Sequence, residues 1–241
     1  MESTKETGAL IRELVFANRI LAREGVVDAF GHVSVRHPRN PDRYLLARSR
    51  SPELVTGDDI MEFTLEGEAI DGRGRRPYGE RMIHGAVYEL RPEIHSVVHN
   101  HAQEVIPFGV TGAKLRPIMH VCGPIGAAVP IWDIRKKFGD TDLLVINMEQ
   151  GRDLARRLGG GSVALMRGHG CVVAGRTLRE AVMIAIFVQV NARLQLQALP
   201  LGKPRFLSAG EIQKCTERQF SPLALERAWE YWCARAGCAS L

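Results

Sequence analysis

The sequence predicts a mixed α/β domain in which helices flank a largely antiparallel or mixed sheet. Two observations favour this class. Apolar residues recur at helical spacing in some segments and alternate at strand spacing in others. The two kinds of segment do not follow the regular strand–helix–strand rhythm of a parallel sheet. With 241 residues, the chain suits one large domain or one domain with an extension.

The first part of the chain predicts a helix and then a hairpin. Residues 5–24 carry apolar side chains at helical spacing, and a glycine follows as a stop signal. Val33 and Val35 then alternate with polar residues, and a Pro-Arg-Asn-Pro turn leads to a second strand at Tyr44. Residues 60–70 predict a further strand and turn.

The rest of the chain continues to mix the two patterns. Helical spacing predicts helices at 79–90, 102–109, 177–199, 208–217 and 222–235, and apolar runs predict strands at 94–99, 142–146 and within 163–174. No internal repeat or low-complexity linker interrupts this series.

Composition excludes several classes of protein. The chain has no run of 18 apolar residues, and its N-terminus lacks the apolar stretch of a signal peptide. Its five cysteines lack the spacing of a zinc ribbon, so we expect a reduced, cytoplasmic protein with no membrane partner. The net charge is +5, but acidic residues separate most of the basic ones, which argues against nucleic acid as a partner. A small basic surplus also suits a small anionic substrate.

Three histidines lie within the short segment HSVVHNHAQ. His99 and His101 are two residues apart at the end of an apolar strand, so both imidazoles can face one site. This spacing suits two neighbouring ligands of a divalent transition metal, although packing alone can also produce it. His95 has the same parity but lies too far back along the strand, and we expect it to be structural or exposed.

Two further residues could complete such a site. His169 lies between glycines in Arg-Gly-His-Gly, which leaves it accessible, and the alternative is an ordinary turn histidine. Glu80 begins the helix that leads to the histidine strand and could act as a general acid/base or a ligand. The alternative for Glu80 is a carboxylate that complements the helix dipole. His84, one turn later, is expected to be packed rather than catalytic.

The ordered motifs GHVSVR, GERMIHGAVYELRPEIHSVVHNHA and RGHG resemble the class II aldolase/adducin family over roughly residues 8–200. The resemblance implies a three-layer α/β/α fold with a central, mainly antiparallel sheet. It implies a divalent metal held by His99, His101 and His169, with Glu80 as the catalytic acid/base. It also implies a homotetramer with active sites at subunit interfaces. We therefore expect a catalytic domain at 1–205 and a helical tail at 206–241 that packs at such an interface.

The substrate motifs depart from those of the family's sugar-phosphate aldolases. Those enzymes hold phosphate through a Gly-Asn-x-Ser segment and a serine pair before the carboxylate, whereas this chain has Gly-His-Val-Ser at 31–34 and Pro-Tyr-Gly at 77–79. Guanidinium groups nearby suit carboxylates, although any one of them could be a solvated surface charge. The expected substrate-binding residues are Ser34, Arg48, Arg50, Arg76, Tyr78 and Tyr231, with Arg75 as a further candidate.

This pattern is similar to the branch of the family that decarboxylates hydroxylated aromatic or pyridine dicarboxylates, such as 3-hydroxy-2-methylpyridine-4,5-dicarboxylate and 3,4-dihydroxyphthalate. The resemblance implies a metal-dependent decarboxylase in which Glu80 supplies a proton directly or through His32, with a small anionic aromatic substrate. We favour Mn²⁺ as the metal, with Zn²⁺, Fe²⁺ or Co²⁺ as alternatives. The alternative functions are a sugar-phosphate aldolase or epimerase and a non-enzymatic adducin-like interaction module.

Overall fold

A computed structural model describes residues 2–238 of the chain. At its centre is a seven-stranded sheet in the order β3-β2-β1-β4-β7-β6-β5. All neighbouring strands are antiparallel except β5 and β6, which are parallel. The strands are β1 (His32–Arg36), β2 (Arg43–Ala47), β3 (Ile60–Thr64), β4 (Ser96–Asn100), β5 (Ile131–Trp132), β6 (Val163–Met166) and β7 (Gly170–Gly175).

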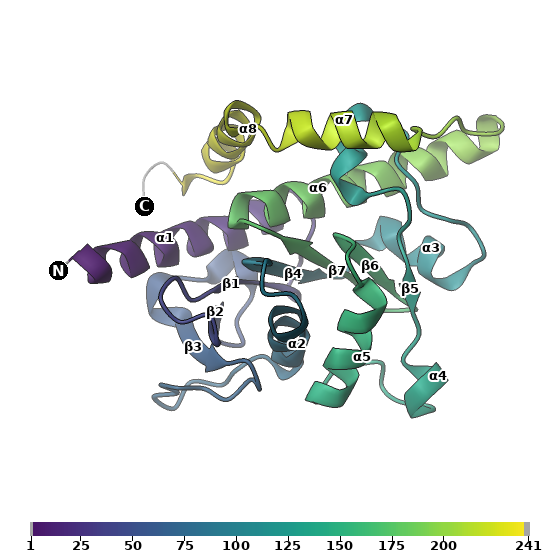
Figure 1. The fold of residues 1–241 in the computed structure, drawn as a ribbon. Coiled ribbons are helices and arrows are strands. Elements are labelled where there is room, and N and C mark those ends of the chain that lie inside the picture. Colours follow the sequence, from purple (N-terminus) through teal and green to yellow (C-terminus); the bar gives the residue numbers. More distant parts are fainter. Residues whose placement is uncertain (1, 239–241) are drawn as a thin grey trace.

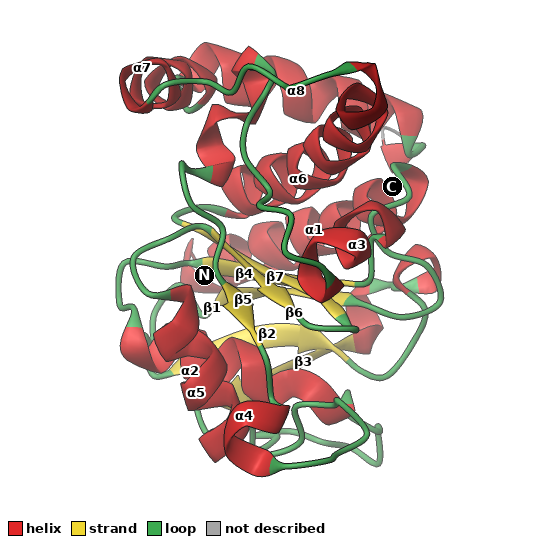
Figure 2. Cartoon of the chain, turned by 90° about the vertical axis from the view of Figure 1, so that its right-hand side faces the viewer, coloured by secondary structure: helices red, strands yellow, loops and turns green. Residues whose placement is uncertain are grey.

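Helices cover both faces of the sheet and complete a three-layer α/β/α fold (Figures 1 and 2). The α-helices are α1 (Glu2–Arg23), α2 (Met82–Leu90), α3 (Ile106–Val110), α4 (Arg135–Phe138), α5 (Met148–Leu158), α6 (Leu178–Ala198), α7 (Ala209–Gln219) and α8 (Pro222–Arg235). In Figure 1, α1 and α6 lie above the sheet with α7 and α8 beyond them, and α2 and α5 lie below it. The expected fold class is confirmed.

Alternation along the strands produces a separate core on each face. On β4, Val98 joins the cluster packed under α1 and α6, while its neighbour Val97 joins the cluster that includes Ile83 of α2. Successive side chains of a strand point to opposite faces, so one strand can serve both cores. The central strands are therefore buried on both sides, and polar side chains within them need internal partners.

The expected strand at 142–146 is wrong. Residues 139–147 form an irregular segment in which the Leu143 amide donates to Thr141 Oγ1 and the Leu144 amide donates to Asp142 Oδ1. Leu143 has a φ of 69°, which no strand allows. Three short or polar elements, β5, α4 and α5, were also not predicted. Five of the 11 residues of α5 are charged, and the apolar side chains of that helix face the core on one side only.

The C-terminal helices pack on their own chain. Trp229 and Trp232 of α8 are buried in the same hydrophobic cluster as residues of α1 and α6, and the Trp232 ring lies 6.0 Å from that of Phe187. Helix α6 is long and apolar enough to cross a membrane, but 56% of its most apolar window is buried inside the fold. This burial is typical of the core helix of a folded domain.

Candidate metal centre

Two neighbouring strands bring the three predicted metal-binding histidines together. His99 is the fourth residue of β4, His101 follows the end of that strand, and His169 occupies the turn between β6 and β7. Strand β7 pairs with β4 so that Asn100 lies opposite Cys171, which places the turn beside the histidine pair. This close approach requires glycine at 170, because a Cβ there would lie 2.0 Å from the Asn100 carbonyl oxygen.

The three imidazoles converge through their Nε2 atoms. His101 Nε2 lies 3.0 Å from His99 Nε2 and 3.1 Å from His169 Nε2. Together with a carboxylate oxygen of Glu80, these donor atoms all lie within 4.8 Å of one another. His99 is fully buried, and His101 and His169 are partly buried. The shared face predicted from the His-x-His spacing is confirmed.

Backbone carbonyls fix the tautomers of two of these histidines. Nδ1 of His99 donates to the Cys171 carbonyl at 3.1 Å, and Nδ1 of His169 donates to the Leu143 carbonyl at 3.0 Å. A carbonyl can only accept, so each Nδ1 carries the hydrogen and each Nε2 of the neutral ring presents a lone pair. This is the arrangement by which proteins orient metal-binding histidines.

The cluster fits a divalent transition metal. His101 Nε2 can carry at most one hydrogen, but it faces the Nε2 lone pairs of both His99 and His169, 3.0 and 3.1 Å away. At least one of these two close nitrogen pairs therefore has no hydrogen between its atoms. Histidine nitrogens bound ~2.0–2.1 Å from one ion at right angles would lie about 3 Å apart. Burial and the neighbouring histidines lower the pKa of His101 to about 4, which keeps that ring neutral and able to bind a cation. Manganese, zinc, iron and cobalt all accept such a donor set.

Glu80 lies on the fourth side of the cluster, in the single 3₁₀ turn Gly79–Arg81 that precedes α2. Its Oε1 accepts a hydrogen bond from the Val145 amide at 3.0 Å. Its Oε2 lies 3.5 Å from Nε2 of both His99 and His169. Burial opposes ionisation, but the two imidazoles hold the pKa of this carboxyl well below its usual range. Glu80 is therefore a carboxylate that either binds a metal or handles a proton beside it.

His32 borders the cluster and is joined to a buried polar chain. Strand β1 pairs His32 with His99, and the two rings lie 5.2 Å apart. His32 Nδ1 lies 2.6 Å from His84 Nε2, and His84 Nδ1 lies 2.6 Å from Ser34 Oγ. Ser34 Oγ in turn lies 2.7 Å from the Tyr88 hydroxyl. The chain forms because alternate residues of β1 face residues one helical turn apart on α2.

This chain changes the interpretation of two residues. Ser34 is fully buried, and its hydroxyl already contacts His84 and Tyr88, so no surface remains for a substrate to touch. A substrate-binding role for Ser34 is thus not supported. His84 is packed, as expected, but it also contacts His32, which the sequence did not reveal. The available signal was the spacing of polar residues: His32 and Ser34 are two apart in a strand, and His84 and Tyr88 are four apart in a helix.

The predicted arginines differ in their surroundings. Arg48 Nε lies 2.5 Å from Asp59 Oδ1, and Arg50 Nη1 lies 2.9 Å from Asp59 Oδ2. Although partial burial opposes it, hydrogen bonds from Thr56 and Arg48 lower the pKa of Asp59 to about 2. Arg75 donates to four backbone carbonyls, those of residues 58, 60, 71 and 72. Arg76 is exposed, and its guanidinium has no partner in the described part of the chain.

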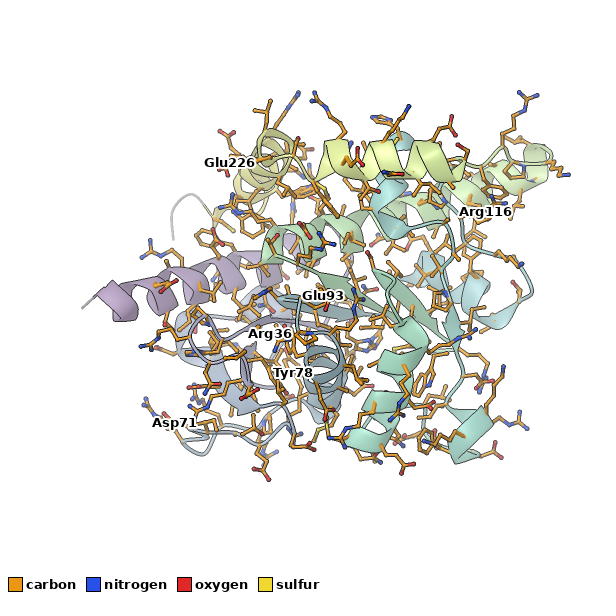
Figure 3. All side chains as sticks on the ribbon, viewed as in Figure 1. Arg36, Asp71, Tyr78, Glu93, Arg116 and Glu226 are labelled. Carbon is orange, nitrogen blue, oxygen red and sulfur yellow. The ribbon has the colours of Figure 1, made fainter. Side chains whose placement is uncertain are left out.

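The two predicted tyrosines lie in different layers. Tyr78 packs against His32 with 4.6 Å between ring centroids, and its hydroxyl donates to the Arg50 carbonyl. Tyr231 lies on α8, is 57% exposed and belongs to the helical layer on the other side of the sheet. Figure 3 shows this separation between the labelled Tyr78, beside α2, and Glu226 of α8. Within one chain, Tyr231 is not part of the histidine site.

His95 lies outside the cluster, as expected. It is exposed just before β4, and its backbone amide donates to the Gly175 carbonyl. Sequence reasoning missed Leu143 and Val145, whose backbone groups hold His169 and Glu80. No side-chain pattern could have found them, because the contacts use only main-chain atoms.

Comparison with known proteins identifies the family. Residues 12–196 match the Class II Aldolase and Adducin N-terminal domain. The chain belongs to the class II aldolase and adducin family. Among curated relatives, decarboxylase tropJ of Talaromyces stipitatus is 33% identical over 246 residues, which cover 92% of each chain. The 3,4-dihydroxyphthalate decarboxylase of Arthrobacter keyseri is 31% identical over 212 residues, covering 81% of this chain and 82% of that protein.

Solved structures of the family share the fold. The L-fuculose 1-phosphate aldolase of Glaciozyma antarctica PI12 superposes with a TM-score of 0.78 at 23% identity, covering 98% of this chain and 92% of that chain. An aldolase II superfamily protein from Pseudomonas syringae gives a TM-score of 0.79 at 19% identity, covering 97% and 94%. At these identities the likeness establishes the architecture alone.

Proposed function

We propose that this protein is a metal-dependent, non-oxidative decarboxylase of a hydroxylated aromatic or pyridine dicarboxylate. The observation that carries the proposal is the complete donor set of three histidines and one carboxylate, in a chain similar to two proteins named as decarboxylases. An adducin-like interaction module would have no need of three inward-facing imidazoles with fixed tautomers.

Each residue of the site has a part in this reaction. A divalent metal held by His99, His101 and His169 would supply Lewis-acid stabilisation of negative charge. Glu80, ionised at rest, can accept the proton of the ring hydroxyl and deliver it to the ring carbon as the carboxylate leaves as CO₂. Tyr78, whose ring packs against His32, offers an aromatic face against which a planar ring can lie.

Recognition of the second carboxylate falls to an arginine. Arg76 is the best candidate, because its guanidinium is exposed and free of carboxylate partners within residues 2–238. Arg48 and Arg50 are less suitable, because both already bind Asp59, whose single negative charge offsets one of their two positive charges. A guanidinium can hold a carboxylate by two parallel hydrogen bonds.

A sugar-phosphate aldolase is the alternative activity within the family. It is disfavoured because the Ser34 hydroxyl is buried and no serine pair precedes Glu80, so hydroxyls that would hold a phosphate are missing. We further propose that the metal is Mn²⁺ and that the protein is a cytoplasmic homotetramer. The proposal includes no nucleic-acid or membrane partner. In that tetramer, Tyr231 would serve a neighbouring subunit.

A substrate screen tests the proposed function. The purified protein would be supplied separately with Mn²⁺, Fe²⁺, Co²⁺ or Zn²⁺ and offered 3,4-dihydroxyphthalate, 3-hydroxy-2-methylpyridine-4,5-dicarboxylate and L-fuculose 1-phosphate. We expect CO₂ release from at least one dicarboxylate with at least one metal, and no aldol cleavage of the sugar phosphate. Cleavage of the sugar phosphate without CO₂ release would overturn the proposal.

A further inference from the structure

The buried chain from His32 to Tyr88 constrains where its hydrogens lie. It contains two imidazoles and two hydroxyls linked by three short contacts of 2.6, 2.6 and 2.7 Å. Both rings are buried, and neither makes a hydrogen bond or ion pair with a carboxylate in the described part of the chain, so both rings are neutral. Burial also raises the pKa of Tyr88, so its phenol keeps its hydrogen. Each of the four groups therefore has one hydrogen to place.

Three orders of these hydrogens satisfy all three contacts. In the first, Tyr88 donates to Ser34, Ser34 donates to His84 Nδ1, and His84 Nε2 donates to His32 Nδ1. His32 then carries its hydrogen on Nε2. In the second order every bond is reversed, and the hydrogen of the Tyr88 phenol has no acceptor in the described part of the chain. In the third order Ser34 accepts from both Tyr88 and His84, His32 donates from Nδ1, and the hydrogen of the Ser34 hydroxyl has no acceptor in the same part of the chain. A buried donor without an acceptor is costly, whereas an acceptor with a spare lone pair is tolerated.

The free end of the chain faces the site. His32 Nε2 has no hydrogen-bond partner within residues 2–238. The atom is not fully buried, so it keeps contact with solvent. The ring lies between Tyr78 and His99, with centroids 4.6 and 5.2 Å away. The first order thus directs an N–H group from His32 into the space beside the histidine cluster.

We propose that His32 is held as a neutral hydrogen-bond donor, through its Nε2–H, to an anionic oxygen of the substrate, and that His84 and Ser34 are positioning residues that fix this tautomer, with Tyr88 as a donor to Ser34. A neutral imidazole that lost this hydrogen would become an anion, so His32 binds and orients the substrate while proton transfer stays with Glu80. The same hydrogen prevents His32 from becoming a fourth histidine ligand. The identity of the oxygen, carboxylate or phenolate, rests on the proposed function, but the tautomer does not.

Imidazole ¹⁵N NMR of the zinc-loaded protein reads the tautomer without any catalysis. Between pH 6 and 8 we expect His32 to be protonated at Nε2 and unprotonated at Nδ1, with His84 also protonated at Nε2. His32→Ala provides the assignment. A His32 that carries its hydrogen on Nδ1, or on both nitrogens, would overturn the inference whatever the activity of the enzyme.

Two variants test the order of the hydrogens, one expected to reverse it and one expected to leave it unchanged. Ser34→Asp offers only acceptors to His84 Nδ1, so it should reverse the order and move the His32 hydrogen to Nδ1. Tyr88→Phe is the matched control, because Ser34 can still donate to His84, and the tautomer should stay unchanged. Circular dichroism establishes that each variant folds, and the parent spectrum decides the question if one does not. Tautomers that respond in the opposite sense would contradict the proposed order.

Kinetics with the best dicarboxylate then separate hydrogen bonding from proton transfer at His32. His32→Ala should raise KM about ten- to hundredfold, the effect of losing one hydrogen bond to a charged group. His32→Gln retains an N–H donor and should recover most of that loss, with kcat close to the parent's in both variants. Equal and large losses of kcat in both would show that His32 transfers a proton, and would refute the proposed role.

Discussion

The carbonyl oxygen of Leu143 accepts the Nδ1 hydrogen of His169 at 3.0 Å, and Leu143 holds it there in a left-handed conformation with a φ of 69°. A leucine in this conformation costs roughly 1–2 kcal/mol. Two residues later, the Val145 amide binds Glu80 Oε1. The segment therefore orients two of the four groups of the candidate metal site, and backbone strain at such a place is consistent with a positioning role.

Leu143 is expected to affect metal affinity through its backbone alone. Proline fixes φ near −65°, so Leu143→Pro should turn the carbonyl away from His169 and weaken Zn²⁺ or Mn²⁺ binding about 10- to 100-fold. Leu143→Gly is the matched control, because glycine adopts positive φ and should keep the affinity within about threefold of the parent. Isothermal titration calorimetry measures both. Equal affinities for the proline and glycine variants would show that this hydrogen bond is unimportant.

Removal of a histidine ligand should release the metal. His99→Ala or His101→Ala removes one of three convergent nitrogens, so we expect most of the bound metal to be lost while circular dichroism shows that the fold persists. His95→Ala, at the exposed residue just before β4, is the control and should bind as much metal as the parent. Metal analysis of the purified proteins measures this, and full occupancy in both ligand variants is the result that rejects the site.

Glu80→Gln separates proton transfer from metal binding. Glutamine can still accept the Val145 amide, so the geometry should survive, but it cannot cycle a proton. General acid/base groups contribute typically ~100- to 10,000-fold, and we expect kcat to fall at least about a hundredfold with metal content near the parent's. Loss of metal together with activity would instead make Glu80 a fourth ligand. Near-parental turnover would leave it only a charge at the start of a helix.

Among the arginines, Arg76 should discriminate most strongly between dicarboxylate and monocarboxylate. A charge-assisted hydrogen bond contributes ~1.5–3 kcal/mol, so Arg76→Ala should raise KM for 3,4-dihydroxyphthalate roughly ten- to hundredfold more than for 2,3-dihydroxybenzoate, the monocarboxylate that keeps the carboxylate beside a ring hydroxyl. Arg75→Ala should chiefly lower the free energy of unfolding, because its guanidinium binds four carbonyls. Steady-state kinetics provide the measurement. If alanine at 48, 50, 75 and 76 leaves both substrates unaffected, no arginine of this group binds the second carboxylate.

The stability of the metal-free protein should fall in mild acid. Burial lowers the pKa of folded His84 to about 3, whereas an unfolded histidine titrates near 6.5. Between these values the unfolded state binds more protons, so the free energy of unfolding decreases as the pH falls from about 6.5 towards 3. One pKa unit corresponds to about 1.4 kcal/mol. Urea unfolding at a series of pH values should show a shallower dependence for His84→Gln, and identical slopes would contradict a buried neutral His84.

The sequence by itself determined the fold class and the candidate metal-binding residues. The spacing of apolar residues predicted most of the flanking helices and the β1–β2 hairpin, because alternation and helical spacing are local properties of the chain. The His-x-His pair could be recognised because two residues on one strand face share a direction whatever the rest of the protein does. The ordered motifs then pointed to His169 and Glu80, whose spatial approach no local pattern encodes.

Tertiary structure alone decided the parts that depend on main-chain atoms or on contacts between distant elements. The segment at 142–146 has the apolar composition of a strand, but its own polar side chains bind its amides and Leu143 takes a positive φ. Its carbonyl and amide groups then orient His169 and Glu80, which sequence cannot show because every residue carries the same main-chain groups. Likewise, Ser34 and His84 lie 50 residues apart, and only the packing of α2 on β1 makes them hydrogen-bond partners.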